Sequence, residues 1–527
     1  MENAAAQKVE DGGRTDRISK LPKDILYHIL YFMSKNEAAR TCVLSKSWRR
    51  VWINRLKLTF DERSSSFDGP HRTRLFVSSV NEALQSYLDN HNIHRIEEFH
   101  LILMNNSESI LLLEKWIPML DATPIRELCL WILPKLGRKF PYVDDLPSAV
   151  FKSERLARLC LYRCKLSLEK IHFARLDRLR LSYVKFTERV FENIASSCPL
   201  ITTMWFKECT WFEECDDEEV KTITLEKKLH KNLKHFTFIN DRAHRMDKRR
   251  VEIHVTTLET IHVHGCTVQI HGNKFRNLKE LSLGVVILLR ESFDFSSRHE
   301  FPVLTSLRLH GTLRWEYLNL RMNAPELTSI RYAAQIVPAI TFTSPISSRC
   351  TSDIVIFRMQ TDPVSWLLDL HAFLQTISRS EIRLCMCNVL EFVERVFVEN
   401  KPPVVVQVLG LSFMKNRSYY FPSFLNGMFS VCSPMIIVQE SFIEGEAKSE
   451  RDQKELVKFL WEFLTKRDGT FRRKQDLEGL WIDRFDTNGQ HWKRALLSEC
   501  VLPESKNRLR LRLKWRERKA NCDDSTS

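Results

Sequence analysis

The chain has 527 residues, 43% hydrophobic and 28% charged, so it can bury a core and is neither disordered nor of low complexity. Its 80 lysine and arginine residues against 66 acidic ones give a formal net charge of +14, and only 14 glycines and 18 prolines exclude a collagen-like or linker-dominated chain. This length predicts two to four compact domains, or one small domain joined to a repeat array.

No targeting or membrane segment is evident in the sequence. The first seventeen residues lack the apolar run of a signal peptide, and runs such as 128–133 and 285–289 are far shorter than the roughly 20 residues of a membrane span. We therefore expect no membrane association, a location in the nucleus and/or cytoplasm, and 14 cysteines that are mostly reduced thiols.

Residues 21–52 have the pattern of three short helices. Pro22 suits a first helical turn, where its missing N–H costs nothing, and Ser45 is a good N-cap for the third helix. The first helix carries an apolar stripe made of Ile25, Leu26, Ile29, Leu30 and Met33. Three helices of this size cannot bury all these side chains alone, which implies a partner or docking onto the next domain.

The same segment resembles an F-box of the form common in plant F-box/leucine-rich-repeat proteins. The string DRISKLPKDIL at 16–26 matches the start of that form, and VLS at 43–45 follows in order. The resemblance implies that an F-box docks on a Skp-type adaptor of a cullin-RING ubiquitin ligase. The residues it assigns to adaptor contact are Leu21, Pro22, Ile25, Ile29, Leu30, Leu44 and Trp48. The alternatives are a three-helix packing unit without a partner and, for Trp52, packing against the next domain.

Beyond a polar junction at 61–70 the chain repeats a six-residue pattern, apolar-x-x-apolar-x-apolar. Its copies begin 20 to 32 residues apart, about 26 on average, which is the spacing of leucine-rich repeats. The ten copies start at residues 96, 125, 156, 176, 201, 233, 258, 278, 304 and 327. Weaker copies follow near 351, 380 and 406, and LEGLWI at 477 fits the pattern again.

Each copy predicts one strand and a return segment, and the return segments 75–88 and 109–120 have helical patterns. A single unit cannot bury its apolar edge, so neighbours stack. The predicted fold class is α/β, with an N-terminal three-helix F-box followed by a leucine-rich-repeat solenoid with a curved parallel sheet. The predicted divisions are a disordered N-terminus (1–15), the F-box (16–60), a junction with the first return helix (61–95), the solenoid (96–430), an α/β capping region (431–518) and a disordered tail (519–527).

Strand alternation separates core from surface residues within each copy: the fourth and sixth residues point inward, so the third, fifth and seventh line the concave surface. Aromatic and arginine side chains often anchor interfaces, which makes this surface the predicted site for a target protein or ligand. The alternative is that they are ordinary exposed strand residues. The residues assigned to it are Trp131, Tyr162, Arg178, Arg180, Trp205, His262, His264, Arg308, His310 and Arg331.

Constellations of metal-type side chains occur, but the sequence predicts no metal site. His262, His264 and Cys266 lie two residues apart on one strand, with His271 nearby, whereas structural zinc sites usually use tighter loops or helices. The cysteine pairs 160/164 and 385/387 are explained by packing. The acidic run 213–219 lacks the glycine and spacing of a calcium loop, which favours a solvated insertion.

The C-terminal region predicts an amphipathic helix at 451–467 and strands at 477–485 and 507–515. Between Glu504 and Lys519, eight basic residues oppose two glutamates, which places six of the 14 net positive charges in one segment. Alternating leucines make this a half-buried strand with a basic outer face. A solvated face is favoured, and a nucleic-acid-binding face is the alternative.

No phosphate-loop, hydrolase-elbow or metalloprotease motif occurs, which predicts a non-catalytic protein without a required cofactor. The F-box resemblance implies a substrate-recognition subunit of an SCF-type ubiquitin ligase, whose partners are a Skp-type adaptor, a cullin-RING scaffold and an unknown target protein. One alternative is a repeat array gated by a ligand or an inositol polyphosphate, as in some relatives. The arginines that could hold phosphate are Arg178, Arg180, Arg308 and Arg331. The other is a basic nucleic-acid-binding protein.

Overall fold

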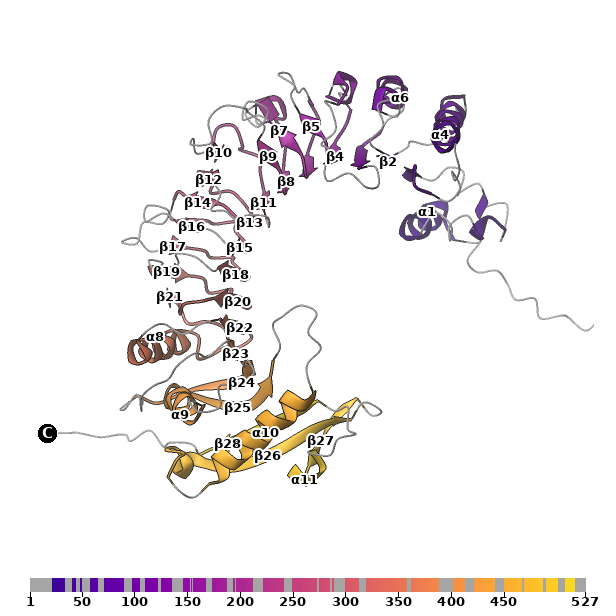
Figure 1. Cartoon of the computed structure of the whole chain (residues 1–527). Coiled ribbons are helices and arrows are strands. Elements are labelled where there is room, and N and C mark those ends of the chain that lie inside the picture. The colour runs from indigo at the N-terminus through magenta and orange to yellow at the C-terminus, as the bar shows by residue number, and fades with distance from the viewer. Residues whose placement is uncertain are drawn as a thin grey trace, which may run out of the picture. The chain divides into compact units, whose positions relative to one another are not determined.

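The computed structural model divides the chain into two compact units, Met1–Glu214 and Cys215–Ser527, each described here by itself. Figure 1 labels their helices and strands. The structure describes residues 21–33, 40–43, 48–49, 57–64, 71–89, 97–104, 110–121, 125–134, 146–151, 153, 155–166, 173–186, 193–194, 196–211, 221–240, 249–272, 274–284, 287–288, 299–311, 319–357, 362–387, 401–412, 421–440, 450–466, 469–486, 490–500 and 508–516. The predicted disordered ends and the acidic run 213–219 lie outside these ranges.

Helix α1 (Lys23–Phe32) opens the first unit at the place where the sequence predicts the first F-box helix. Its backbone becomes extended at Met33, and a short 3-10 helix, η1 (Thr41–Val43), follows. Other parts of the predicted second and third helices fall outside the described residues, so the three-helix arrangement stays a prediction.

Six strands of the first unit form one parallel sheet in the order β1-β2-β3-β4-β6-β8. Their bounds are β1 (Lys57–Asp61), β2 (Glu98–Met104), β3 (Glu127–Leu133), β4 (Arg158–Tyr162), β6 (Arg178–Ser182) and β8 (Thr203–Lys207). A second, short parallel sheet consists of β5 (Lys165–Leu166), β7 (Lys185–Phe186) and β9 (Thr210–Trp211). The long strands are the strands predicted for the repeats, and the short strands, which were not predicted, lie in the return segments. One long strand with its return segment is called a rib below.

Both predicted return helices of the first unit are present, as α4 (Arg72–Asp89) and α6 (Leu113–Asp121), and η3 (Ser148–Phe151) replaces a helix in the next rib. The rings of Phe76 and Trp116 pack edge-to-face, with centroids 6.4 Å apart, and the Trp116 indole donates a 2.9 Å hydrogen bond to Asn81 Oδ1. Among the described residues of this unit, α4 and α6 lie on the same side of the sheet (Figure 1).

Nine strands of the second unit continue the same design as a parallel ladder in the order β11-β13-β15-β18-β20-β22-β23-β24-β25. Their bounds are β11 (His235–Ile239), β13 (Thr260–His264), β15 (Glu280–Gly284), β18 (Ser306–Gly311), β20 (Ser329–Ala334), β22 (Thr351–Ile356), β23 (Glu381–Cys387), β24 (Val404–Ser412) and β25 (Cys432–Gln439). Two short parallel sheets accompany the ladder. They are formed by β10 (Lys221–Leu225), β12 (Arg249–Ile253), β14 (Thr267–Ile270) and β16 (Ile287–Leu288), and by β17 (His299–Glu300), β19 (Asn319–Asn323) and β21 (Ala339–Phe342).

The last part of the second unit changes from parallel to antiparallel pairing. Helices α8 (Pro363–Thr376) and α9 (Phe421–Val431) are the return segments before β23 and β25. The later elements are α10 (Glu450–Thr465), η5 (Lys474–Asp476), β26 (Leu477–Asp486), β27 (His491–Ala495), α11 (Leu497–Cys500) and β28 (Leu509–Trp515). Strand β28 pairs antiparallel with β25 on one side and with β26 on the other, so it covers the edge of the last parallel strand.

The repeat register read from the sequence is confirmed. Each of the ten copies has its strand two residues after the first residue of the pattern, and that first residue is buried in every copy whose first residue is described. The copy at 477 is the exception, because LEGLWI forms β26, an antiparallel strand outside the ladder. The predicted C-terminal helix and both strands are present as α10, β26 and β28.

Alternate residues of the parallel strands point away from the core and form a surface that we call the strand face. In β4 and β8, for example, Leu159, Leu161, Met204 and Phe206 are buried, whereas their neighbours are partly exposed. Residues of neighbouring strands are paired without stagger: Glu98, Glu127 and Arg158 share one row, and His100, Cys129 and Cys160 share the next. Positions 29 to 31 residues apart in sequence are therefore direct neighbours on this face.

Candidate functional site

The N-terminal helix has a buried side and an accessible side. Leu26, Leu30 and Trp48 form a small core of buried side chains, against which Leu21, Ile29 and Met33 are packed. Ile25, which directly precedes Leu26 on the same helix, is 47% accessible. Helix α1 therefore has an accessible isoleucine beside a closed core.

The seven residues predicted to contact an adaptor therefore have different environments. Pro22 and Ile25 are exposed, Leu21 and Ile29 are half-buried, and Leu30 and Trp48 belong to the core of the module. Leu44 lies outside the described residues. Adaptor contact remains a prediction for all seven, and the burial of Leu30 and Trp48 gives these two a supporting position behind the accessible edge.

Aromatic side chains form a continuous ladder on the strand face of the first unit. Trp131 stacks on Tyr162, with centroids 5.1 Å apart, and Tyr162 meets Tyr183 edge-to-face at 5.2 Å. The guanidinium of Arg163 lies 5.4 Å from the Tyr162 ring and 5.5 Å from the Tyr183 ring. Since 42% of Trp131 is accessible, the ladder presents a preformed aromatic surface with low remaining side-chain freedom.

A charged row lies on the same strands, separated from the aromatic ladder by one intervening row. Arg158 forms an ion pair with Glu127, at 2.8 Å between Nη1 and Oε2, and its guanidinium also approaches Glu98. Arg178, which pairs with Arg158 in register, is exposed. The guanidinium of Arg180 covers the Trp205 ring at 4.1 Å, so these two predicted residues form a single cation–π pair.

Three metal-type side chains share the middle row of this face. His100, Cys129 and Cys160 belong to the adjacent strands β2, β3 and β4 and are paired in register. The thiol of Cys129 donates to Glu127 Oε1 at 3.3 Å, and Cys160 is its register partner on the neighbouring strand. The neighbouring Cys129 and the charge of Arg180 lower the pKa of Cys160, whereas the proximity of Cys160 and burial raise the pKa of Cys129.

Sequence reasoning missed this cluster, although the repeat contained a signal for it. His100, Cys129 and Cys160 each occupy the fifth residue of their copy of the pattern, at the copies beginning at 96, 125 and 156. An alignment of the repeat copies with one another places these three residues at the same position. Cys160 was considered instead with Cys164, four residues away in sequence, which is buried in the core.

Histidines and arginines occupy the strand face of the second unit. The His235 ring lies 3.0 Å from Thr260 Oγ1, and His262 Nε2 lies 3.3 Å from Glu280 Oε2. Gly284 is paired with His264, and a Cβ at this glycine would come within 1.9 Å of the imidazole. The glycine therefore creates the space that the His264 ring occupies.

A positive group lies further along the same face. Arg308 and Arg331 are paired in register on β18 and β20, and Asp353 is the next residue in the row. Burial lowers the pKa of His310, and the nearby His264, Arg308 and Arg331 lower it further, so its imidazole is neutral at pH 7. The predicted phosphate ligands thus form two arrangements: Arg308 with Arg331 here, and Arg178 with Arg180 in the other unit.

The four metal-type residues His262, His264, Cys266 and His271 do not form one cluster in the structure. His262 and His264 share the strand face, but Cys266 is buried after the turn at Gly265. His271 follows β14 in the short second sheet, where its ring stacks on His254 with centroids 4.0 Å apart. Among the described residues, His254 and His271 have Glu252 as their metal-type neighbour.

The interpretation of Cys385 and Cys387 as packing residues agrees with their burial. Cys385 and Cys387 on β23 are both buried, and burial raises their pKa values to about 11 and about 12. Protonated thiols of this kind pack as small apolar groups.

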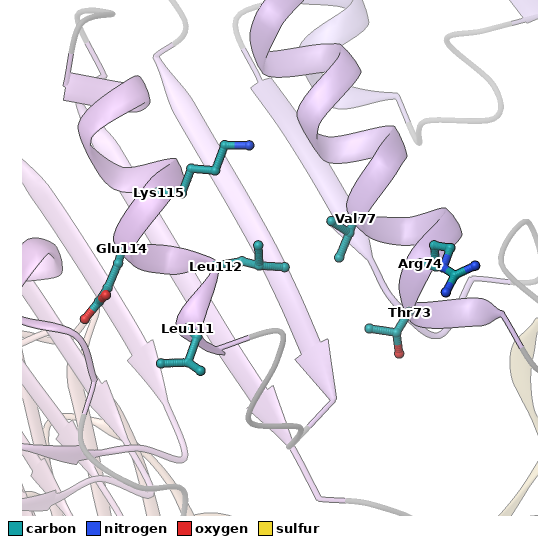
Figure 2. Close-up of a pocket in the computed structure, with 7 residues that line it drawn as sticks. All are labelled: Thr73, Arg74, Val77, Leu111, Leu112, Glu114 and Lys115. Atoms are coloured by element: carbon teal, nitrogen blue, oxygen red, sulfur yellow. The ribbon is translucent and has the colours of Figure 1, made fainter.

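A shallow apolar groove lies on the helical side of the first unit, between α4 and α6. Figure 2 shows Val77 and Leu112 facing each other across it, with Arg74 and Lys115 on opposite sides. Leu111, which is 63% accessible, extends this apolar surface. The groove belongs to the helices and is separated from the strand face by the sheet.

Part of the basic charge of the C-terminal strand is paired with carboxylates of its neighbour. Asp483 on β26 is 1% accessible, and its carboxylate accepts hydrogen bonds from Arg510 Nε at 2.9 Å and Arg512 Nε at 3.1 Å. Glu478 on the same strand forms an ion pair with Lys514 at 3.0 Å. The predicted half-buried strand is confirmed, but the basic charge of its outer face is offset by carboxylates that the count over 504–519 left out.

Comparison with protein families matches two segments of the chain. Residues 18–59 match the F-box domain, and residues 113–217 match the leucine-rich repeats described as "FBD-associated F-box protein At5g56370, LRR repeats". The chain carries an F-box followed by leucine-rich repeats. The resemblance found in the sequence is therefore confirmed.

Curated relatives from Arabidopsis thaliana have the same two-part description. F-box/LRR-repeat protein At2g42720 is 32% identical over 207 residues, which are 38% of this chain and 45% of that protein. F-box/LRR-repeat protein At3g59200 is 30% identical over 204 residues, which are 37% of each chain. The matches thus span less than half the length of these relatives. Among the helices in the described parts of the chain, none combines the length and apolar character that crossing a bilayer requires.

Proposed function

We propose that this F-box/LRR chain is the substrate-recognition subunit of an SCF-type ubiquitin ligase. The observation that carries the proposal is the F-box match at 18–59 together with an accessible apolar edge on α1. In this role the F-box binds a Skp-type adaptor, which connects it to a cullin-RING scaffold. The chain does no bond chemistry, because holding a target beside the conjugating enzyme raises the effective concentration of its lysines.

Within the F-box, accessible and buried residues take different parts in this proposal. Pro22 and Ile25 contact the adaptor directly, with half-buried Leu21 and Ile29 at the margin of the contact. Leu26, Leu30 and Trp48 fix the position of α1 by packing behind it. Burial of Ile25 against the adaptor supplies a transfer free energy of about 1 to 2 kcal/mol.

An Ile25→Asp variant tests the adaptor contact. A carboxylate at this position has to be desolvated in the complex, so we expect affinity for a purified Skp-type adaptor to fall at least tenfold. Binding is measured by calorimetry, and the thermal unfolding midpoint shows that the variant remains folded. The matched control is Leu111→Asp, which places the same charge at a 63% accessible leucine outside the F-box. Unchanged binding by Ile25→Asp, or no binding by the wild type, contradicts the proposal.

The target protein binds the strand face in this proposal, and the aromatic ladder is its anchor. Trp131 and Tyr162 are stacked and accessible from the strand side, and large rigid aromatic rings are the commonest interface anchors. The test captures proteins from extracts with and without proteasome inhibition, using wild type and a Trp131→Ala/Tyr162→Ala variant. Partners stabilised by inhibition and lost from the double variant support the assignment. The control is Leu496→Ala, at an exposed leucine outside the strand face, and equal capture by all three proteins contradicts it.

A ligand-gated version of the same role is the second candidate, favoured by the pairing of Arg308 with Arg331. Arg308 Nε is buried without a hydrogen bond, so this guanidinium has an unused donor beside a second arginine. Inositol hexakisphosphate is the probe, and the thermal unfolding midpoint is the readout. A rise of several degrees in the wild type that is lost in Arg331→Ala supports gating, and no rise dismisses it.

Nucleic-acid binding is the weaker alternative, since Asp483 and Glu478 offset the basic face of β28. It predicts binding to duplex DNA that weakens steeply with salt, and a flat or absent response dismisses it. The ubiquitin-ligase role places the protein in the nucleus and/or cytoplasm, and a fluorescent fusion observed in living cells tests this location.

A further inference from the structure

The middle row of the strand face in the first unit gathers the donor atoms of a metal site. His100 on β2, Cys129 on β3 and Cys160 on β4 are consecutive partners in the ladder, and Glu127 lies two residues before Cys129 on the same strand and the same face. Imidazole nitrogen, thiol sulfur and carboxylate oxygen are the three donor types that Zn²⁺ accepts in proteins.

These donor atoms already lie close to one another. The ligand atoms of His100, Glu127 and Cys129 are all within 4.8 Å of each other, and Cys129 Sγ is 3.3 Å from Glu127 Oε1. Cys160 is the direct register partner of Cys129 on the neighbouring strand and belongs to the same row of the strand face. Zinc–sulfur bonds of about 2.3 Å and zinc–nitrogen bonds of about 2.0 Å need only a modest contraction of this group.

His100 provides an independent sign of an unsatisfied site. Its Nε2 is buried and makes no hydrogen bond, and the nearest carboxylates, those of Glu98 and Glu127, are 3.5 and 3.8 Å away. A buried ring nitrogen without a hydrogen bond costs free energy. Coordination of a cation at this nitrogen removes that cost.

We propose that His100, Cys129, Cys160 and Glu127 form a zinc-binding site on the strand face. His100 donates Nε2, the two cysteines bind as thiolates after releasing their protons, and Glu127 donates Oε1. Three adjacent ribs thus supply the four donors that a tetrahedral Zn²⁺ site needs, and two sulfur ligands favour Zn²⁺ over Mg²⁺ or Ca²⁺.

Two arginines around the row fit this assignment. Arg158 holds Glu127 Oε2 at 2.8 Å, which orients the carboxylate and leaves Oε1 directed at Cys129. Arg180, paired with Cys160 in register, adds a positive charge next to the second sulfur. Two thiolates and a carboxylate carry three negative charges against the two positive charges of zinc, and these arginines offset the excess.

The site is distinct from the group formed by Glu252, His254 and His271 in the second unit. That group consists of two imidazoles and one carboxylate and contains no thiol. A probe that reports thiolate coordination therefore observes the first unit without interference from this second set of donors.

Cobalt(II) is such a probe, because thiolate ligands give it a charge-transfer absorption in the near ultraviolet that imidazole and carboxylate ligands do not give. The full chain, reduced and stripped of metal by a chelator, is titrated with Co²⁺ and then with Zn²⁺. We expect one equivalent of Co²⁺ to produce the charge-transfer band and one equivalent of Zn²⁺ to remove it. Absence of the band from folded wild-type protein overturns the proposal.

Variants then assign the ligands. Cys129→Ser and Cys160→Ser each lower the band by about half or abolish it, and His100→Gln weakens Co²⁺ affinity at least tenfold. The matched controls are Cys164→Ala, a buried thiol in the same rib as Cys160 but on its core side, and His254→Asn. Both controls keep the band at full intensity. A band that survives the Cys129→Ser/Cys160→Ser double variant, or that is lost in Cys164→Ala, overturns the assignment, and circular dichroism verifies that each variant is folded.

Discussion

The residue that follows a face strand adopts a left-handed conformation in four ribs. Three of these residues are not glycine: Arg163 has φ 58°, Tyr183 has φ 55° and Glu208 has φ 53°, whereas Gly265 has φ 76°. The next residue in each rib is buried, and it is a cysteine in three of the four, at Cys164, Cys209 and Cys266. These cysteines therefore occupy one structural position that accepts a small apolar side chain.

Gly265 is the member of this set whose missing side chain matters most. A Cβ there would lie 1.9 Å from the Asn240 carbonyl oxygen, in a rib that crosses closely over its neighbour. We expect Gly265→Ala to lower the free energy of unfolding by about 1 to 3 kcal/mol, measured by urea denaturation. Arg163→Gly relieves a strained backbone at the equivalent position and is expected to change it by less than about 1 kcal/mol. Equal effects of the two substitutions would refute the steric explanation.

His230 gives the second unit a pH dependence. Burial lowers its pKa, and its Nδ1 lies 3.1 Å from the backbone nitrogen and oxygen of Glu226. Because the folded-state pKa lies below the unfolded value of about 6.5, the unfolded chain binds more protons as pH falls. The stability contribution is complete above the unfolded pKa and is lost as pH falls through the folded pKa.

We expect His230→Gln to reduce this pH dependence. The free energy of unfolding of the wild type falls between pH 7.5 and pH 5, and the variant shows a smaller fall over the same interval. Urea denaturation at several pH values measures both curves. The control is His28→Gln, at an exposed histidine, which should leave the slope unchanged. A variant slope equal to that of the wild type would count against His230.

At the level of the element, helix α8 shows how a local signal can be present and overlooked. Asp362 accepts hydrogen bonds from the Val364 and Ser365 backbone nitrogens at 3.1 and 3.3 Å, and Pro363 is the first helical residue. An aspartate cap followed by proline is a standard start signal for a helix. The helix is apolar around much of its circumference, burying Trp366, Leu370 and Phe373, so its amphipathic pattern is weak and the pattern of the repeats dominated the interpretation.

Asp483 links the adjacent strands β26 and β28 of the antiparallel sheet through charge. Its removal leaves Arg510, which is only 20% accessible, without its carboxylate partner. We expect Asp483→Ala to lower the free energy of unfolding by about 1 to 3 kcal/mol in urea denaturation. Glu478→Ala removes a carboxylate from the same strand whose partner Lys514 is 66% accessible, and should cost less than about 1 kcal/mol. If the two variants lose the same stability, burial is not the deciding factor.

At the scale of the molecule, the C-terminal sheet determines how the parallel ladder of the second unit ends. Strand β28 occupies the edge of β25, and its Trp515 donates a hydrogen bond to the Pro434 carbonyl at 2.7 Å. Trp515 also lies under the guanidinium of Arg473 at 4.5 Å and packs with Phe429 and Phe471. An uncovered edge with these aromatic groups exposed is a template for association.

Truncation tests this closure of the edge. A chain that ends at residue 507 lacks β28, and we expect it to form oligomers or aggregates in size-exclusion chromatography with light scattering. A chain that ends at residue 516 keeps β28 and should elute as the full-length protein does. A monomeric, soluble product of the shorter truncation would show that β25 does not need its antiparallel cover.

Much of this architecture could be predicted because the repeats carry their own register. The pattern positions gave the strand starts, the buried rows and the exposed rows, since alternation within a strand is a local property. The resemblance of residues 16–26 to an F-box was equally local. Neutralisation of β28 by Asp483 was not foreseeable in the same way, because it depends on which distant strand lies beside it.

In the candidate site, too, local features could be predicted from the sequence and contacts between distant residues could not. The outward direction of Tyr162 and Arg180 could be read from the repeat, but the stacking of Tyr162 on Trp131 and of Arg180 on Trp205 required the pairing of neighbouring ribs. Which residues of α1 are buried depends on where Trp48 packs against this helix, and the apolar pattern of the helix alone does not reveal this. Sequence thus indicated which residues face outward, and structure was needed to show which of them meet.

Unstaggered pairing between ribs has a consequence for how such a protein can diversify. Core and face residues alternate along every strand, so selection can rewrite one face residue, such as Trp205, without disturbing buried neighbours such as Met204 and Phe206. A new binding specificity can therefore arise by substitution of face residues alone, while the buried residues that hold each rib in place stay the same.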